Sequence, residues 1–317
     1  DDQQDLNNAE ALFAEEKQAL SLYGKRFGGY WRFPMLLDFC YLVNPYFPNP
    51  RLKEEMKANF DTLLTEYPSG MQVNAQLAAR YAGISADQII VGNGAAELIN
   101  SYMRILPSCK TGVILPTFEE YPNRLNQEAL EYFIPDNPDF SYTGSDIMAY
   151  FKDKPIKQLL IINPDNPSGN LLSKAELMSL LEWSKSKEIK LVVDESFLDF
   201  AQSGNSISLL DEDLLNLNPH LIVIKSISKS YGVPGLRLGF LASGNKELIR
   251  LLKKDISIWN INSFAEFYMQ IFIKYKDDYE KACLKFLRER DRFFSNLRQV
   301  SFLRVIPSAA NYFLCEV

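Results

Sequence analysis

Short apolar segments alternate with helix-forming stretches through most of this chain, from about residue 51 to residue 254. An apolar strand without polar alternation is buried on both faces, as in a parallel sheet between two layers of helices. The pattern therefore predicts an α/β fold in which helices sandwich a mostly parallel sheet. The expected strands cover residues 88–91, 112–115, 159–162, 191–193, 221–224 and 238–242.

Two of the intervening helices have local sequence signals. One is expected over residues 95–106, directly after a glycine-containing turn. The other should cover residues 173–185, where Ser173 is the predicted N-cap and Glu176 completes a capping box.

The alternation stops after about residue 254. Residues 264–297 are helix-forming, with charges among aromatic residues and leucines, and strand-like segments follow at 302–305 and 312–316. An amphipathic helix is also expected near the N-terminus, over residues 8–21. We therefore predict a large domain over residues 51–254 and a smaller α+β domain made of residues 1–50 and 255–317.

The chain lacks an initiator methionine and stops at Val317 within an apolar run. The small domain therefore looks incomplete, and we expect a piece of a longer polypeptide, such as one module of a fusion protein.

Composition limits the classes of function. The net charge of −6 disfavours nucleic acid and anionic membranes as partners. No apolar run reaches the roughly 18–20 residues that span a bilayer, and no signal peptide is visible, so a cytoplasmic protein is expected. With one histidine, His220, and four cysteines that form no CxxC pair, neither a metal site nor a histidine-based triad is expected.

Polar residues follow four of the predicted strands, at the point where each strand ends. Parallel sheets bind ligands at the carboxyl ends of their strands, so these residues should meet at one edge. A single group would mean little, whereas four in order are difficult to explain as loop chemistry. The groups are Gly92-Asn93-Gly94, Asn163-Pro164-Asp165-Asn166-Pro167, Asp194-Glu195 and Ser226-Ile227-Ser228-Lys229.

The glycine-containing turn leads from a strand into a helix. Its small residues let a phosphate approach the N–H groups of the helix N-terminus, where the helix dipole favours an anion. Glu97 stands where the dinucleotide fingerprint has its third glycine, which counts against a nicotinamide dehydrogenase. On this segment alone, a tight turn without a ligand is an equal alternative.

The lysine segment is more specific. Ser226, Ser228 and Lys229 are followed by Arg237 eight residues after the lysine. These groups suit one phosphorylated ligand, because the planar guanidinium of arginine binds two phosphate oxygens at once. A lysine close to other cations has a lowered pKa and can supply the neutral amine that a Schiff base requires. Lys225, which lacks the arginine spacing, is the rival lysine, and a solvated basic loop is the plainer alternative.

Three segments together resemble the class I/II aminotransferases, which use pyridoxal phosphate (PLP) and have the fold called type I. Residues 226–229 with Arg237 and Gly239 resemble the cofactor-lysine signature, residues 163–169 resemble the NPxNPTG loop, and residues 194–197 resemble the DEAY turn. The order and spacing match over nearly the whole chain. The histidinol-phosphate aminotransferase and threonine-phosphate decarboxylase branch is the most similar, on Phe27-Gly28-Gly29, Asn44-Pro45, Tyr67-Pro68 and Ser308-Ala309-Ala310-Asn311-Tyr312.

The resemblance implies roles for the matching residues. Lys229 would hold the cofactor as a Schiff base and then move the Cα proton, and Asp194 would keep the ring nitrogen protonated. Asn166 would donate a hydrogen bond to the phenolate oxygen of the ring. Phe118 would stack on the ring, with Tyr121 as the fallback. The other cofactor-binding residues would be Gly94 and, around the phosphate, Ala95, Ala96, Ser226, Ser228 and Arg237.

Tyr67 would reach the phosphate of a neighbouring subunit, which implies a homodimer with shared sites. Plainer roles are a helix cap for Asp194, a turn former for Asn166 and core packing for Phe118 and Tyr67. Phe197 also lies in the implied cofactor site, where many relatives have a tyrosine whose hydroxyl contacts the phenolate oxygen. The phenylalanine lacks that bond and also suits the decarboxylase-like branch.

Part of the substrate site is not visible in the sequence. The relatives bind the substrate α-carboxylate with an arginine in a strand beyond the segment that matches residues 308–312. The chain ends at Val317, before that strand, and Arg304 is not an obvious substitute.

Two reactions fit these residues. The resemblance favours an aminotransferase, which moves an amino group between an L-amino acid and a 2-oxo acid through Lys229. The alternative is a decarboxylase of a phosphorylated amino acid, which would use Lys229, Asp194 and Asn166 in the same way. Carbon dioxide release without glutamate formation from 2-oxoglutarate would exclude the first. A non-catalytic module with a degenerate site is a third hypothesis, which a failure to bind PLP would support.

Overall fold

The computed structural model describes residues 42–106, 109–202 and 204–317, together with the single positions 29, 31, 35, 37 and 39. The chain divides into two compact units, residues 1–42 and 43–317, and the second contains every element given below. The helix predicted over residues 8–21 lies outside the described residues.

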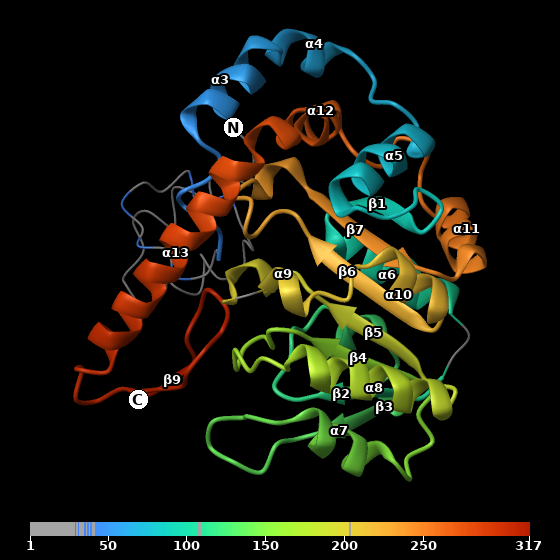
Figure 1. Cartoon of the computed structure of the whole chain (residues 1–317), viewed down its shortest axis with the longest axis vertical. Helices are drawn as coiled ribbons and strands as arrows, with labels where there is room; N and C mark the ends of the chain where they lie inside the picture. The colour runs from blue at the N-terminus through green and yellow to red at the C-terminus, as the bar shows by residue number, and fades with distance from the viewer. Residues whose placement is uncertain are drawn as a thin grey trace, which may run out of the picture. The chain divides into compact units, whose positions relative to one another are not determined.

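A seven-stranded sheet forms the centre of the second unit (Figure 1). Its strands are, in spatial order, β1 (Ile89–Asn93), β7 (Leu238–Ser243), β6 (Leu221–Ser226), β5 (Lys190–Asp194), β4 (Gln158–Ile162), β2 (Thr111–Ile114) and β3 (Leu130–Phe133). The strands from β6 to β3 are parallel, whereas β7 is antiparallel to β6 and β1 is antiparallel to β7. The predicted mostly parallel sheet is therefore confirmed.

Helices precede, connect and follow these strands. They are α3 (Pro50–Ala58), α4 (Phe60–Thr65), α5 (Met71–Ala82), α6 (Ala95–Ile105), α7 (Gly144–Phe151), α8 (Lys174–Ser186), α9 (Gly204–Ile207), α10 (Glu212–Leu217), α11 (Lys246–Asp255), α12 (Ser263–Phe272) and α13 (Lys276–Leu297). Because α3, α4 and α5 follow one another directly, the alternation expected from residue 51 begins only at β1. Two short antiparallel strands, β8 (Arg304–Val305) and β9 (Cys315–Glu316), fall within the two strand-like segments predicted near the C-terminus.

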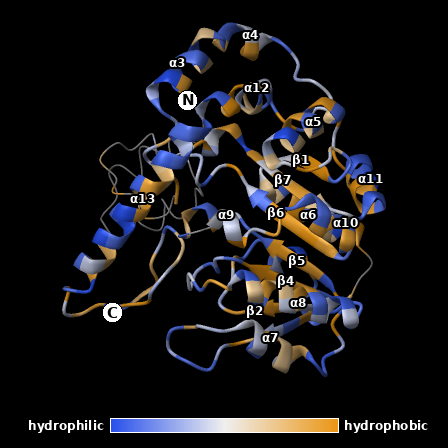
Figure 2. Ribbon diagram, viewed as in Figure 1, coloured by the Kyte–Doolittle hydropathy of each residue, from blue (hydrophilic) through white to orange (hydrophobic). Residues whose placement is uncertain are grey.

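Successive residues of the central strands face opposite layers of helices. In β5, Leu191 and Val193 belong to the core that also contains residues of α5, α7, α8 and α12. Val192 belongs to the core that contains residues of α6 and α11. Figure 2 shows these strands as hydrophobic ribbons, with hydrophilic residues on the helices around them. The alternation decides which strand-end side chains share a face of the sheet.

Local sequence signals explain some elements better than others. The capping box of α8 is confirmed, since the Ser173 side chain accepts from the N–H of Glu176 and the Glu176 carboxylate accepts from the N–H of Ser173. The sequence analysis missed β3, an edge strand in which only Leu130 is buried, because such a strand has no continuous apolar run. The division into a large domain and a small domain stays a prediction.

The described residues offer neither a membrane span nor a metal cluster. None of the helices in this part of the chain has both the length and the apolar composition for crossing a bilayer. No group of three or more His, Cys, Asp or Glu side chains within these residues could hold a metal ion.

Candidate active site

The carboxyl ends of four strands meet at one edge of the sheet (Figure 1). β5 ends at Asp194, β6 ends at Ser226 and β4 ends directly before Asn163. β1, which is followed by Gly94, is antiparallel to β7 and therefore runs in the same direction as β6. The structure thus places all four polar segments predicted from the sequence at the same edge.

Asp194 is buried at the end of β5, on the face of the sheet that α6 and α11 cover. One carboxylate oxygen accepts a hydrogen bond from the N–H of Ser196 at 2.9 Å, and the other accepts from the Tyr121 hydroxyl at 2.7 Å. Burial raises the pKa of this carboxyl, while the two hydrogen bonds and the charge of Lys229 oppose that rise. A cation opposite Asp194, such as a protonated ring nitrogen, would favour the ionised form.

The bond from Tyr121 gives this residue a role that the sequence analysis did not find. Its ring is fully buried in the same core as α6, and burial together with Asp194 raises the pKa of its hydroxyl well above the ordinary value. The hydroxyl therefore stays protonated and donates to Asp194. The two residues are 73 positions apart, so no local pattern in the sequence could have paired them.

Lys229 lies on the turn that follows β6. Its carbonyl accepts hydrogen bonds from the N–H groups of Asn44 at 3.0 Å and Gly232 at 3.2 Å. Its Nζ lies 5.4 Å from the centre of the Phe197 ring and has no hydrogen bond or ion pair with the described residues. Burial lowers the pKa of this amine, and Arg237 lowers it further against the opposing charge of Asp194. Lys229 is therefore held by its backbone, with an amine that is neutral more often than an exposed lysine.

The rival lysine has a different environment. Lys225 is buried on the opposite face of β6, where its Nζ lies 2.6 Å from a carboxylate oxygen of Asp199. Burial alone would lower its pKa, but Asp199 and Glu195 outweigh that effect and the pKa is raised. Lys225 is thus a paired cation, which supports Lys229 as the reactive amine.

The N-terminus of α6 and Arg237 form a cradle for an anion. Gly94 has a left-handed backbone with φ of 78°, and a Cβ at this position would lie 2.5 Å from an Arg237 guanidinium nitrogen. A Cβ at Gly239 would lie 2.5 Å from the N of Ala95. The N–H groups of Ala95 and Ala96 belong to the first turn of the helix, where backbone donors have no partner within the helix. Positions 94 and 239 therefore accept only glycine. The N–H groups of Ala95 and Ala96 remain available to bind a phosphate at this helix N-terminus.

Two serines complete this cradle. Ser226 pairs with Gly239 across β6 and β7, and its Oγ accepts a hydrogen bond from the N–H of Ser228 at 3.3 Å. The Ser228 Oγ is buried and has no hydrogen-bond partner among the described residues. A buried hydroxyl without a partner is costly, and a phosphate oxygen would satisfy it. The residues present therefore fit a phosphorylated cofactor.

The loop after β4 contacts the C-terminal segment. Gly169 has φ of 75°, and its carbonyl accepts a hydrogen bond from the N–H of Ala309 at 2.9 Å. The Tyr312 hydroxyl donates to the carbonyl of Asp165 at 2.6 Å. The two matching segments, residues 163–169 and 308–312, are therefore neighbours. Asn166 is half-buried within this loop.

The predicted aromatic residues lie in three different environments. Phe197 is buried, and its ring meets that of Tyr312 edge-on at 5.1 Å. Phe118 is 43% exposed, and its ring centre is 6.4 Å from that of Tyr121 beside Asp194. Tyr67 is 79% exposed, and its ring lies 4.7 Å from that of Trp259. Among the described residues, no hydrogen bond or ring contact joins Tyr67 to the other predicted site residues.

The fold agrees with that of known proteins. The chain belongs to the aminotransferase class I and II family, whose model matches residues 37–317. Members of this family use pyridoxal phosphate, which is therefore the cofactor that the cradle, Lys229 and Asp194 fit.

The individual relatives include both decarboxylases and aminotransferases. The chain is 29% identical to a CMP-5'-(3-aminopropyl)phosphonate synthase of Streptomyces rubellomurinus over all of this chain, but it spans only 49% of that protein. It is 30% identical to an L-serine phosphate decarboxylase of Campylobacter jejuni, with 89% of this chain and 74% of the relative covered. The crystal structure of a histidinol-phosphate aminotransferase from Clostridium acetobutylicum matches with a TM-score of 0.75 and 26% identity, over 89% of this chain and 83% of that chain.

The residues described above can be assigned to parts of the cofactor. Pyridoxal phosphate, when bound, withdraws electrons from the bonds at the Cα of an amino acid attached to it. Asp194, held by Tyr121 and Ser196, would accept the N–H of the ring nitrogen. Lys229 would bind the cofactor through its amine and carry a proton to or from Cα. The phosphate would bind at Arg237, Ser226, Ser228 and the N–H groups of Ala95 and Ala96.

Proposed function

We propose that this chain catalyses PLP-dependent decarboxylation of an amino acid that carries a phosphate or phosphonate group. The observation that carries a PLP-dependent reaction is one arrangement at the sheet edge. There, the end of β5 with the Asp194 carboxylate and the turn after β6 with the Lys229 amine lie beside an anion cradle. The decarboxylase of C. jejuni supports the reaction type, and the phosphonate synthase of S. rubellomurinus supports an acidic phosphorus group on the substrate.

The site itself agrees with this choice at Phe197. Its ring packs against Tyr312 and faces the Lys229 amine, and it offers no hydroxyl to the cofactor. In decarboxylation the bond between Cα and the carboxylate breaks, carbon dioxide leaves, and Cα gains a proton. Lys229, whose pKa is lowered by burial, would donate that proton as its ammonium form.

Transamination, which the sequence analysis favoured, is the second candidate. The C. acetobutylicum aminotransferase supports it, because the match covers most of both chains. In transamination, Lys229 would remove the proton from Cα and deliver it to a different atom. Asp194 would accept the N–H of the ring nitrogen, as in decarboxylation. The two reactions therefore share the residues and differ in which bond at Cα breaks.

Product analysis separates the two candidates. Protein loaded with PLP would be incubated with O-phospho-L-serine, O-phospho-L-threonine or 2-amino-4-phosphonobutyrate, with and without 2-oxoglutarate. Carbon dioxide release without glutamate formation supports the decarboxylase. Glutamate formation from 2-oxoglutarate without carbon dioxide release supports the aminotransferase and contradicts the decarboxylase. The Lys229→Ala variant is the control, because it should form neither product.

We also propose a homodimer with shared sites, in which Tyr67 of one subunit reaches the phosphate bound by the other. The high exposure of Tyr67 supports this, since its hydroxyl is free to meet a second chain. Subunit mixing tests it. The Lys229→Ala and Tyr67→Ala variants should each be weak alone, and a mixed dimer should regain activity because one of its two sites contains both native residues. No gain on mixing, with a monomer in light scattering, would contradict the shared site.

A further inference from the structure

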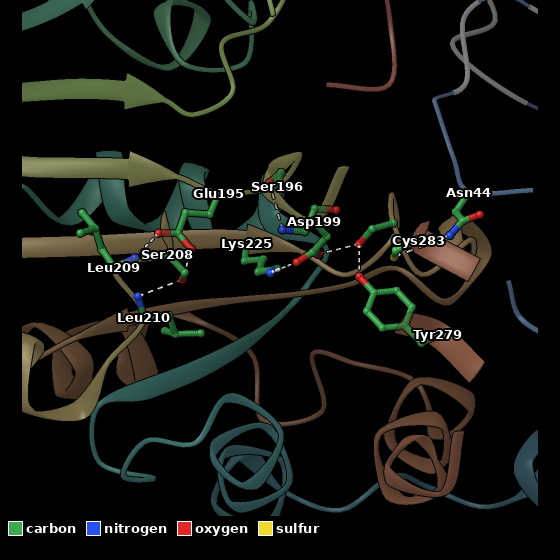
Figure 3. Close-up of polar contacts among 12 residues, drawn as sticks. Asn44, Glu195, Ser196, Asp199, Ser208, Leu209, Leu210, Lys225, Tyr279 and Cys283 are labelled. Atoms are coloured by element: carbon green, nitrogen blue, oxygen red, sulfur yellow. Dashed lines mark hydrogen bonds and ion pairs between the residues drawn. The ribbon is translucent and has the colours of Figure 1, made fainter. Parts of the chain in front are cut away.

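A chain of buried polar groups lies behind the turn that carries Lys229. Lys225 forms an ion pair with one oxygen of Asp199 at 2.6 Å, and the other oxygen of Asp199 accepts from the Ser230 hydroxyl at 2.7 Å. The Tyr279 hydroxyl of α13 donates to the Ser230 oxygen at 2.9 Å. Figure 3 shows Lys225, Asp199 and Tyr279 along this chain of contacts. It connects β6, the segment after β5 and α13.

The same turn is held by packing on its other residues. The Tyr231 ring stacks on the Tyr279 ring, with centres 4.2 Å apart and planes within 6°. Gly232, with φ of 63°, leaves no room for a Cβ because the carbonyl oxygen of Phe47 is in that place. The residues directly after Lys229 are therefore fixed by Tyr279 on one side and by the segment that contains Phe47 on the other.

We propose that Tyr279 and Asp199, acting through Ser230, are positioning residues that fix the place of the Lys229 amine. They contact neither the cofactor site nor Lys229 Nζ in the described residues, and they lie on the opposite face of the sheet from Asp194. The inference rests on the proposed role of Lys229. It assigns to α13 the task of holding the residue next to the reactive lysine.

The physical reason is the position of Ser230. It follows Lys229 directly, is fully buried, and has one hydroxyl that both donates and accepts. If that hydroxyl loses its partners, the turn can relax, and the long Lys229 side chain amplifies a small backbone shift. An error of about 1 Å in placing a reacting group can cost about a hundredfold in rate.

The test compares single hydroxyl deletions. Tyr279→Phe keeps the ring that stacks on Tyr231 and removes only the bond to Ser230. Ser230→Ala removes the bonds to both partners. Tyr275→Phe is the matched control, since the Tyr275 hydroxyl donates at 2.7 Å to Glu55, outside this network. The measurement is the rate at which cofactor-free protein captures added PLP, followed by the absorbance of the bound cofactor, with melting temperatures recorded for each variant.

We expect Tyr279→Phe to capture PLP about three- to tenfold more slowly than the native protein, which corresponds to the loss of one hydrogen bond. Ser230→Ala should be at least as slow, and the double variant should be no slower than Ser230→Ala, because both changes remove the same bond. Tyr275→Phe should remain within about twofold of the native rate.

A purely structural role gives a different result. Tyr279→Phe would then lower the melting temperature but capture PLP within twofold of the native rate, and the proposal would be overturned. If Ser230→Ala fails to fold, Tyr279→Phe alone decides the question. Borohydride trapping of PLP on the native protein is a separate check. Label on a lysine other than Lys229 would overturn the proposed function, whatever the Tyr279→Phe rate.

Discussion

The two faces of one sheet edge differ in how their buried polar groups are satisfied. On the face covered by α6 and α11, the Ser228 hydroxyl has no partner among the described residues, and the carboxyl of Asp194 is bonded only to neutral donors. On the opposite face, Lys225 is paired with Asp199, and Glu195 accepts from the Ser208 hydroxyl at 2.5 Å and the Leu209 N–H at 2.6 Å. Neighbouring residues at the ends of the same strands thus differ in whether the chain itself supplies partners for their polar groups.

This difference separates binding from support. A buried polar group without its full set of partners is costly, and it persists where a ligand supplies the missing partner. A buried pair that is satisfied within the chain fixes the backbone around it. The Asp194 face therefore has the properties of a binding site, and the Lys225 face has those of the structural support that fixes the backbone around this site. Substitutions on the first face should change activity with little change in stability, whereas substitutions on the second should change stability and affect the site only through the placement of Lys229.

The largest effect should come from Lys229→Ala. Loss of the amine that binds the cofactor and moves the proton should lower turnover by about a thousandfold or more. The free energy of unfolding of the cofactor-free protein should change by less than about 1 kcal/mol, because the amine has no ion pair or hydrogen bond to lose among the described residues. Product assays and urea unfolding measure the two quantities. Turnover within tenfold of native would contradict the assignment of Lys229.

Substitution of Lys225 on the opposite face should lower the free energy of unfolding. Lys225→Met would leave the Asp199 carboxylate buried without its cation, and breaking such a pair costs about 3–5 kcal/mol. Urea unfolding of the cofactor-free protein should show this loss. The double variant Lys225→Met with Asp199→Leu is the control, and it should recover most of the stability because the carboxylate bonded to Lys225 is removed together with its cation.

Equal stabilities of the single and double variants would mean that the ion pair is not the cause. The stability contrast between the two faces would then fail, although the assignment of Lys229 would stand.

Asp165 sharpens the comparison, because it is a buried carboxyl that no cation among the described residues pairs with. Burial raises its pKa from 3.8 to about 6, although the Ser168 hydroxyl and N–H both donate to it. The folded state therefore holds a proton that the unfolded state releases, and stability falls as the pH rises from about 4 to about 6. Asp165→Asn cannot titrate. Relative to the native protein, it should gain roughly 1–3 kcal/mol of unfolding free energy between pH 4.5 and pH 7.

The measurement is urea unfolding of both proteins at several pH values in that range. Taking the difference between the two proteins removes the titration of all other groups. A difference that does not change with pH would show that Asp165 titrates at its ordinary value.

The sequence predicts the first face far better than the second. The central strands have continuous apolar runs because both of their faces are buried, and the polar segments after them mark the edge where Asp194 and Lys229 lie. The bond from Tyr121 to Asp194 and that from Tyr279 to Ser230 join residues 73 and 49 positions apart. Neither bond has a local signal, because a buried tyrosine in a helix or turn has the same pattern whether or not its hydroxyl has a partner.

The smallest effect, and the most specific one for the binding face, should come from Ser228→Ala. Because the Ser228 hydroxyl has no partner among the described residues, its removal should leave the cofactor-free protein as stable as the native one, or up to about 1 kcal/mol more stable. The affinity for PLP should fall by about tenfold, since one hydrogen bond to a charged phosphate is lost. Ser184→Ala is the matched control, because that buried hydroxyl donates to the carbonyl of Leu181 at 2.9 Å inside α8. It should lower stability slightly and leave PLP affinity unchanged. If Ser228→Ala destabilised the cofactor-free protein and kept its affinity for PLP, the hydroxyl would belong to the structural support rather than to the binding site.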